Sequence, residues 1–83
     1  MSKYEPLYRW LSGLKRDQIT VSFQDIENTI SDTLPRAARS HRAWWENQTE
    51  NENRPQARAW MNAGFEVNEC DLEKQRVTFR RRL

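Results

Sequence analysis

Residues 33–47 constrain the fold more than any other part of this sequence. Apolar residues recur there at helical spacing, so we predict one helix over residues 34–46 with two unlike faces. The face expected to be buried holds Ala37, Ala38, His41, Trp44 and Trp45. The opposite face holds Arg36, Arg39, Ser40, Ala43 and Asn47, with Arg42 on its flank. No acidic residue precedes Glu46 in this stretch, so a polyanion would meet no repulsion on that face.

A chain of 83 residues has the length of a single domain, which we take as residues 1–83. Nine aromatic residues supply enough apolar area for a core and argue against disorder. The sequence contains neither an apolar run of membrane-spanning length nor a signal-peptide pattern. A single cysteine, Cys70, allows no internal disulfide, and a cytoplasmic location is therefore expected.

Positive charge is concentrated in two segments. The net charge is only +2, yet residues 35–45 hold three arginines and residues 76–83 hold four, in both cases without an acid. The rest of the chain therefore carries a net charge of −5. A local positive potential attracts phosphates, although runs of charge on a solvated surface have no such role in many proteins.

The predicted elements before residue 33 are a helix over residues 5–12, a strand over 19–22 and a helix reaching residue 30. Ser22 and Asp25 have the spacing of a capping box at the start of the second helix. Glu27 is expected to face outward from that helix. Thr33 is the expected N-cap of the helix over residues 34–46, with Pro35 in its first turn.

After residue 47 the pattern predicts a polar loop, a helix over residues 54–63 capped by Asn53, and a β-hairpin. Gly64 is expected to end that helix in a left-handed conformation. Phe65, Val67, Val77 and Phe79 form the expected inward face of the hairpin. The predicted fold class is α+β: a winged helix-turn-helix-like domain of about four helices, with a C-terminal β-hairpin and a short additional strand.

Several motifs are distinctive: Leu34-Pro35-Arg-Ala-Ala38-Arg39, His41-Arg42-Ala43-Trp44-Trp45-Glu-Asn47, Ala59-Trp60-Met-Asn-Ala63-Gly64-Phe65 and Val77-Thr-Phe79-Arg80. With Tyr4-Glu5-Pro6-Leu7 and Phe23-Gln-Asp-Ile26-Glu27, they cover nearly the whole chain. On these residues the sequence resembles a family of small, largely uncharacterised bacterial and phage proteins. Phe65 stands where that family more often has tryptophan. The resemblance implies a compact domain and brings no function with it.

The residues themselves point to sequence-specific binding of double-stranded DNA, with the helix at 34–46 as recognition helix and the hairpin as a basic wing. Arginine pairs with guanine edges and asparagine with adenine, and small residues permit close approach. The candidate DNA-binding residues are Arg36, Arg39, Ser40, Arg42, Ala43, Asn47, Lys74, Arg76, Thr78, Arg80, Arg81 and Arg82. Transcriptional regulation as a homodimer is the expected role, because paired half-sites would add affinity.

Other functions receive less support from the sequence. One histidine and one cysteine do not form a metal-site pattern, and two glycines form no phosphate loop, so no metal, cofactor, small-molecule substrate or enzyme activity is expected. We interpret His41 as a core residue and Cys70 as a passive strand residue. The alternatives are a phage or host accessory factor that binds a protein through a winged-helix scaffold, or an RNA-binding or toxin-like protein.

Overall fold

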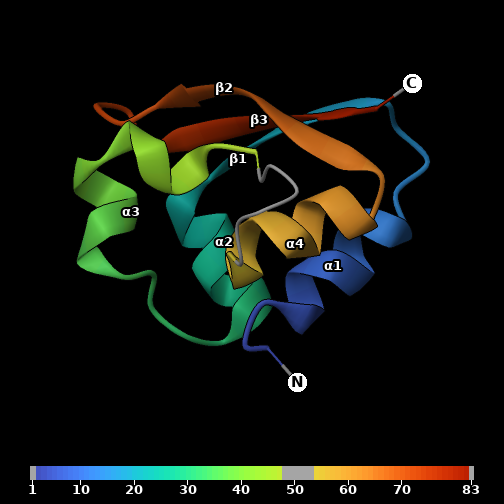
Figure 1. Ribbon diagram of the computed structural model, residues 1–83, viewed down its shortest axis with the longest axis horizontal. Helices are drawn as coiled ribbons and strands as arrows, with labels where there is room; N and C mark the ends of the chain where they lie inside the picture. Colours follow the sequence, from blue (N-terminus) through green and yellow to red (C-terminus); the bar gives the residue numbers. More distant parts are fainter. Residues whose placement is uncertain (1, 48–53, 83) are drawn as a thin grey trace.

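The computed structural model describes residues 2–47 and 54–82 and contains eight elements in this part of the chain. They are, in order, α1 (Glu5–Ser12), β1 (Gln18–Ser22), α2 (Phe23–Ile30), α3 (Arg36–Ser40), the 3₁₀ helix η1 (Arg42–Trp45), α4 (Pro55–Asn62), β2 (Phe65–Asp71) and β3 (Arg76–Arg81). The fold class is therefore α+β, as predicted. The sheet lies on one side of the molecule and α1, α2 and α4 pack beneath it (Figure 1).

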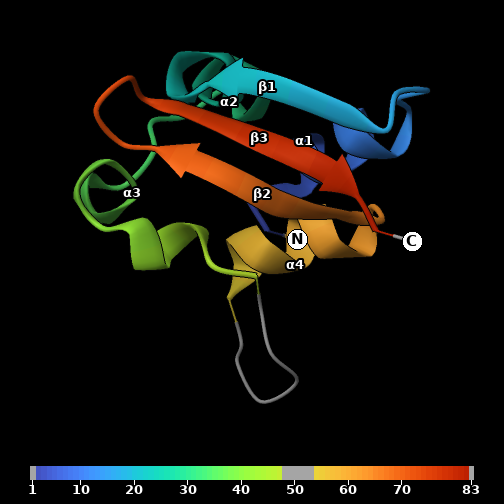
Figure 2. The same cartoon turned by 90° about the horizontal axis from the view of Figure 1, so that it is seen from above.

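The sheet is antiparallel and has the strand order β1-β3-β2, so the strand closest to the C-terminus lies in the middle (Figure 2). Val77 of β3 pairs with Val21 of β1, and Phe79 pairs with Val67 of β2. A bulge between Val67 and Glu69 shifts the alternation of β2. For this reason Val67, expected inside, is half-buried, whereas Cys70 is buried opposite Val77.

Two helix ends, the start of α2 and the end of α4, lie where the local sequence signals predict them. The capping box of α2 is present: the Asp25 amide donates to Ser22 Oγ at 2.9 Å, and the Ser22 amide donates to Asp25 Oδ2 at 3.0 Å. Gly64 follows α4 with φ of +88°, the left-handed conformation that glycine adopts without strain. Asn53, the predicted cap of α4, lies outside the described residues.

A row of aromatic rings joins these elements into one core. Trp45 of η1 stacks on Phe23 of α2 at a centroid distance of 4.9 Å and on Trp60 of α4 at 5.9 Å. Trp60 in turn contacts Phe79 of β3 at 5.6 Å. All four rings are almost completely buried, so each contributes a large apolar area to the core of this small domain.

The single helix predicted over residues 34–46 is wrong. The chain is helical only over α3, turns extended at His41 (φ −129°, ψ 115°), and continues as the 3₁₀ helix η1. The break is stable because the Trp45 side chain takes the Ala38 carbonyl that it frees, and the Ala43 carbonyl in η1 accepts both the Glu46 amide and a second donor. Trp45 Nε1 donates to the Ala38 carbonyl at 2.8 Å, and Arg54 Nη1 donates to the Ala43 carbonyl at 2.7 Å.

Two side chains around this break differ from the prediction. His41, expected in the core, is exposed, because the extended backbone there turns its side chain away from Trp44 and Trp45. Thr33 does not cap α3; Pro35 occupies the N-cap position, without a side-chain hydrogen bond.

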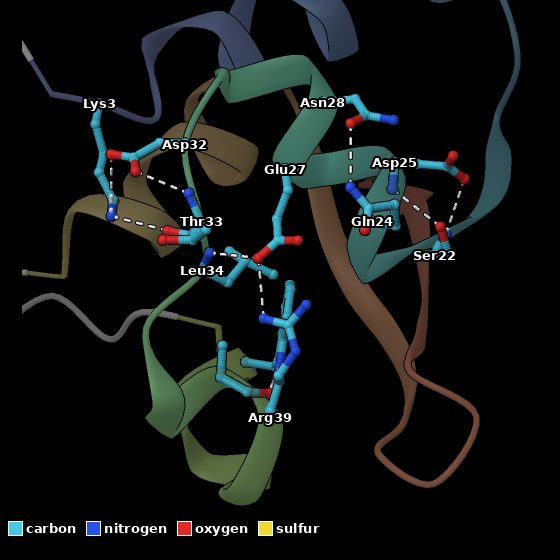
Figure 3. Close-up of polar contacts among 12 residues, drawn as sticks. Lys3, Ser22, Gln24, Asp25, Glu27, Asn28, Asp32, Thr33, Leu34 and Arg39 are labelled. Atoms are coloured by element: carbon cyan, nitrogen blue, oxygen red, sulfur yellow. Dashed lines mark hydrogen bonds and ion pairs between the residues drawn. The ribbon is translucent and has the colours of Figure 1, made fainter.

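Glu27 was expected to face solvent, but it connects α2 to α3 (Figure 3). Its carboxylate accepts the Leu34 amide at 2.7 Å and Arg39 Nη1 at 3.0 Å, and its side chain is only 10% exposed. The hydrogen bonds from Arg39 and from the Leu34 amide lower the pKa of Glu27 below its usual value. The segment that leads into α3 is therefore held by a charged group on the preceding helix.

Replacing Trp45 by phenylalanine should destabilise the protein by about 2–4 kcal/mol, because the change opens a cavity and leaves the Ala38 carbonyl without its donor. The matched variant Trp44→Phe alters a half-buried ring and should cost about 1 kcal/mol. Urea unfolding followed by far-UV circular dichroism measures both values. Equal losses of unfolding free energy for the two variants would contradict the larger contribution expected of the stacked Trp45 ring.

Glu27 should also give the protein a defined acid sensitivity. Its pKa is lowered in the folded state, so its stabilising effect is complete above the usual value of 4.5 and is lost as the pH falls through the folded value. The melting temperature of the wild type should therefore drop more steeply than that of Glu27→Gln between about pH 5 and about pH 3. Glu73→Gln, at an exposed position of the β2–β3 turn, should follow the wild type. Parallel curves for wild type and Glu27→Gln would contradict this role.

Candidate nucleic-acid interface

The predicted DNA-binding residues do not form one surface; they lie at two ends of the sheet. β3 rises about 3.3 Å per residue, so Arg76 at its start and Arg81 at its end are about 17 Å apart. In both views α3 lies at the end of the sheet where β2 turns into β3 (Figures 1 and 2). The C-terminal arginines are at the opposite end, beside the α1–β1 connection.

The first end carries what we call the α3–η1 surface, formed by Arg36, Ser40, His41, Arg42 and Ala43, all exposed. Within residues 2–47 and 54–82, Arg36, His41 and Arg42 form no ion pair. Ser40 Oγ donates to the Arg36 carbonyl at 3.0 Å, so its proton is used inside the helix. The surface thus combines two guanidinium groups that have no ion-pair partner in this part of the chain, an imidazole and a small residue.

Two predicted site residues from this stretch have structural roles. Arg39 is bound to Glu27, as described above. The Asn47 amide accepts the Trp60 indole N–H at 2.9 Å and the Val67 amide at 2.8 Å, and it donates to the Val67 carbonyl at 3.1 Å. Because these bonds occupy the polar atoms that would bond an adenine edge, Asn47 is unsuited to reading a base in this conformation.

The turn between β2 and β3 presents Lys74 and Arg76 near the α3–η1 surface, both exposed. Acidic residues surround them: Asp71 pairs with Arg76 in the strand register and its carboxylate accepts the Lys74 amide at 3.0 Å, and Glu73 lies within the turn. Thr78, further along β3, is buried and shares a hydrogen bond of 2.8 Å with Thr20. The turn is therefore less positive than the basic residues alone suggest.

At the opposite end, the arginines mostly contact their own protein. Arg81 donates to the Asp17 carboxylate and to the carbonyls of Leu14 and Arg16 at 2.9–3.1 Å, and its guanidinium lies 4.7 Å from the centre of the Phe65 ring. Arg80 forms an ion pair with Glu66 at 3.4 Å. Arg82 is exposed. These contacts fasten the end of β3 to the connection between α1 and β1.

Two further ionisable groups, Tyr4 and Cys70, are buried. Burial raises the pKa values of the Cys70 thiol and the Tyr4 hydroxyl, which disfavours their ionised forms. No group of three or more metal-ligating side chains occurs in the described part of the chain. A groove of about 640 Å³ between α1 and α4 is lined by both acidic and basic side chains, with Tyr4 and Tyr8 on its α1 side. Among the described residues, no helix is long and apolar enough to cross a membrane.

Sequence reasoning missed His41 as a member of the exposed surface. The available signal was helical periodicity, and it placed His41 inside because it assumed an unbroken helix. The break depends on the Trp45 indole N–H, which binds the Ala38 carbonyl, and periodicity does not reveal that bond.

Comparison with curated proteins and with solved structures finds no match. A family model described as a domain of unknown function (DUF7662) matches residues 4–82, which is almost the complete chain. This agrees with the resemblance to a family of small, largely uncharacterised proteins. The chain belongs to the DUF7662 family.

Proposed function

We propose that this protein binds double-stranded DNA through the α3–η1 surface and serves as a small regulator of transcription or of another DNA transaction. The observation that carries the proposal is the pair of exposed guanidinium groups, Arg36 and Arg42, next to His41 on a segment without acidic residues. Unpaired arginines are the groups that neutralise backbone phosphates most readily.

The order of elements supports this proposal as a winged helix-turn-helix-like arrangement. Helix α2 precedes α3 by a short connection, β1 precedes both helices, and the β2–β3 hairpin that follows α4 pairs with β1 in a sheet of order β1-β3-β2. In that arrangement the β2–β3 turn would act as the wing, with Lys74 at its tip. The carboxylates of Asp71 and Glu73 would offset the positive charge of the wing, so most of the affinity for DNA would come from the α3–η1 surface.

The shortness of α3 limits how the DNA would be read. Five helical residues extend about 7.5 Å, so α3 can insert little more than one turn into a major groove. Arg36 and Arg42 would then contact phosphates chiefly, and those contacts set position more than sequence. A protein with so few base contacts needs a second copy or a partner to select a site, and a homodimer is part of the proposal.

A protein-interaction role is the second candidate, and a separate observation favours it. The open face of the sheet alternates acidic residues of β2 with arginines of β3, as in the ion pair of Glu66 with Arg80. Paired charges of opposite sign give little net attraction for a polyanion and suit a polar protein surface.

We expect the protein to bind random duplex DNA with an affinity that falls steeply as salt rises. Removing one phosphate contact by Arg36→Gln or Arg42→Gln should reduce the slope of log K against log salt by about 0.9. Arg9→Gln is the matched control, because Arg9 is an exposed arginine on α1, away from α3 (Figure 1). Fluorescence anisotropy with a labelled duplex measures both quantities.

Two results would overturn the proposal. Absence of binding at low salt would exclude DNA and would leave the protein-interaction role. An equal effect of Arg9→Gln and Arg42→Gln would show that net charge, and not the α3–η1 surface, causes the binding.

A further inference from the structure

Helix α3 is attached to the rest of the domain by few contacts. It packs mainly against η1, and both views place it beside the end of the sheet, away from α1 and α4 (Figures 1 and 2). Of its five residues only Ala38 is buried. A helix this short is not stable by itself, so its orientation depends on bonds from neighbouring elements.

One carboxylate oxygen of Glu27 joins α3 to α2 (Figure 3). Glu27 Oε2 accepts both the amide of Leu34, just before α3, and Nη1 of Arg39, within α3. Because the two donors come from different points of the chain, their bonds fix both the start of α3 and its rotation about its own axis. A charged acceptor makes such bonds stronger than those between neutral groups.

A second polar contact lies on the same α2–α3 connection, but at exposed positions. Asp32 Oδ1 accepts the Thr33 amide at 2.8 Å, and Lys3 Nζ lies 3.7 Å from Asp32 Oδ2. The side chains of Lys3 and Asp32 are 41% and 52% exposed, and ion pairs at such positions add little stability. Asp32 is therefore a site at which the charge of this connection can be changed while the bonds from Glu27 to α3 are kept.

We propose that Glu27 is a positioning residue for DNA binding: through Leu34 and Arg39 it holds α3 in the orientation in which Arg36 and Arg42 contact the duplex together. This inference rests on the proposed binding of DNA by the α3–η1 surface. Arg36 begins α3 and Arg42 begins η1, so a rotation of α3 changes the separation of their guanidinium groups. Holding that separation before binding lowers the entropy cost of making both phosphate contacts at once.

The charge of Glu27 makes this role testable, because an acid near a DNA-binding surface ordinarily weakens binding. By charge alone, Glu27→Ala should strengthen binding, since it removes a negative charge and releases the Arg39 guanidinium. A loss of position has the opposite effect. The affinity should fall by about tenfold at ~0.1 M salt, the contribution of one phosphate contact, and the slope of log K against log salt should decrease by about 0.9.

Fluorescence anisotropy with a labelled duplex compares Glu27→Ala with two control variants. Asp32→Ala makes the same change of charge on the same connection, and it should bind DNA at least as tightly as the wild type. Ile26→Val opens a small cavity at a buried position of α2, so it should lower the melting temperature and leave the affinity unchanged. The two controls separate loss of position from change of charge and from loss of stability.

Hydrogen exchange without DNA measures the attachment of α3 independently of binding. The amides of Ala38 and His41 donate to the carbonyls of Pro35 and Ala37. They should exchange about tenfold faster in Glu27→Ala than in Ile26→Val, because a bond to a charged group contributes at least that factor to local stability.

The possible outcomes distinguish this role from the proposed function. Absence of DNA binding by the wild type would overturn the proposed function and, with it, the role of Glu27 in binding. If the wild type binds, equal or tighter binding by Glu27→Ala, or an equal loss in Asp32→Ala, would overturn the positioning role alone. Equal exchange of the α3 amides in Glu27→Ala and Ile26→Val would overturn it as well.

Discussion

The stacking of Trp45 between Phe23 and Trp60 is the contact on which the rest of this structure depends. The three rings come from α2, η1 and α4, and Phe79 extends the row to the central strand. In a domain of this size such large rings make up a considerable part of the core, so the relative position of its elements depends on how flat rings pack. The indole N–H of Trp45 also binds the Ala38 carbonyl, so the same side chain determines where α3 ends.

Much of the fold was predictable from the sequence, because it rests on short-range signals. The Ser22–Asp25 capping box and Gly64 lie within a few residues of the ends that they fix, and the strand alternation of Val77 and Phe79 is similarly local. The prediction of a single helix over residues 34–46 is wrong because the break depends on a side-chain contact that local signals do not contain. The chain breaks at His41, where the Trp45 indole N–H takes the freed Ala38 carbonyl, and local propensity contains no information about such a donor.

The residue types of the candidate site were predictable from the sequence, but the contacts of each residue were not. The sequence identifies which residues are basic, but it does not reveal that Glu27 holds Arg39 or that Asp17 and two carbonyls hold Arg81. Glu27 is 12 residues away from Arg39 along the chain, and Asp17 is 64 residues away from Arg81. The arginines therefore differ in role: Arg39 and Arg81 hold elements of the domain together, whereas Arg36 and Arg42 are exposed and form no ion pair within the described residues. An arginine count therefore overstates the binding surface.

The bonds of Asn47 to Val67 have a consequence for how far any association of this protein can extend. An amide side chain offers a donor and an acceptor side by side, as a backbone does, so Asn47 imitates one residue of a neighbouring strand. A sheet with both edges open can add molecules without limit and grow into fibres. With Val67 at the β2 edge occupied by the protein's own side chain, the sheet cannot grow by strand pairing from that edge, so repeated addition of molecules through both edges is blocked.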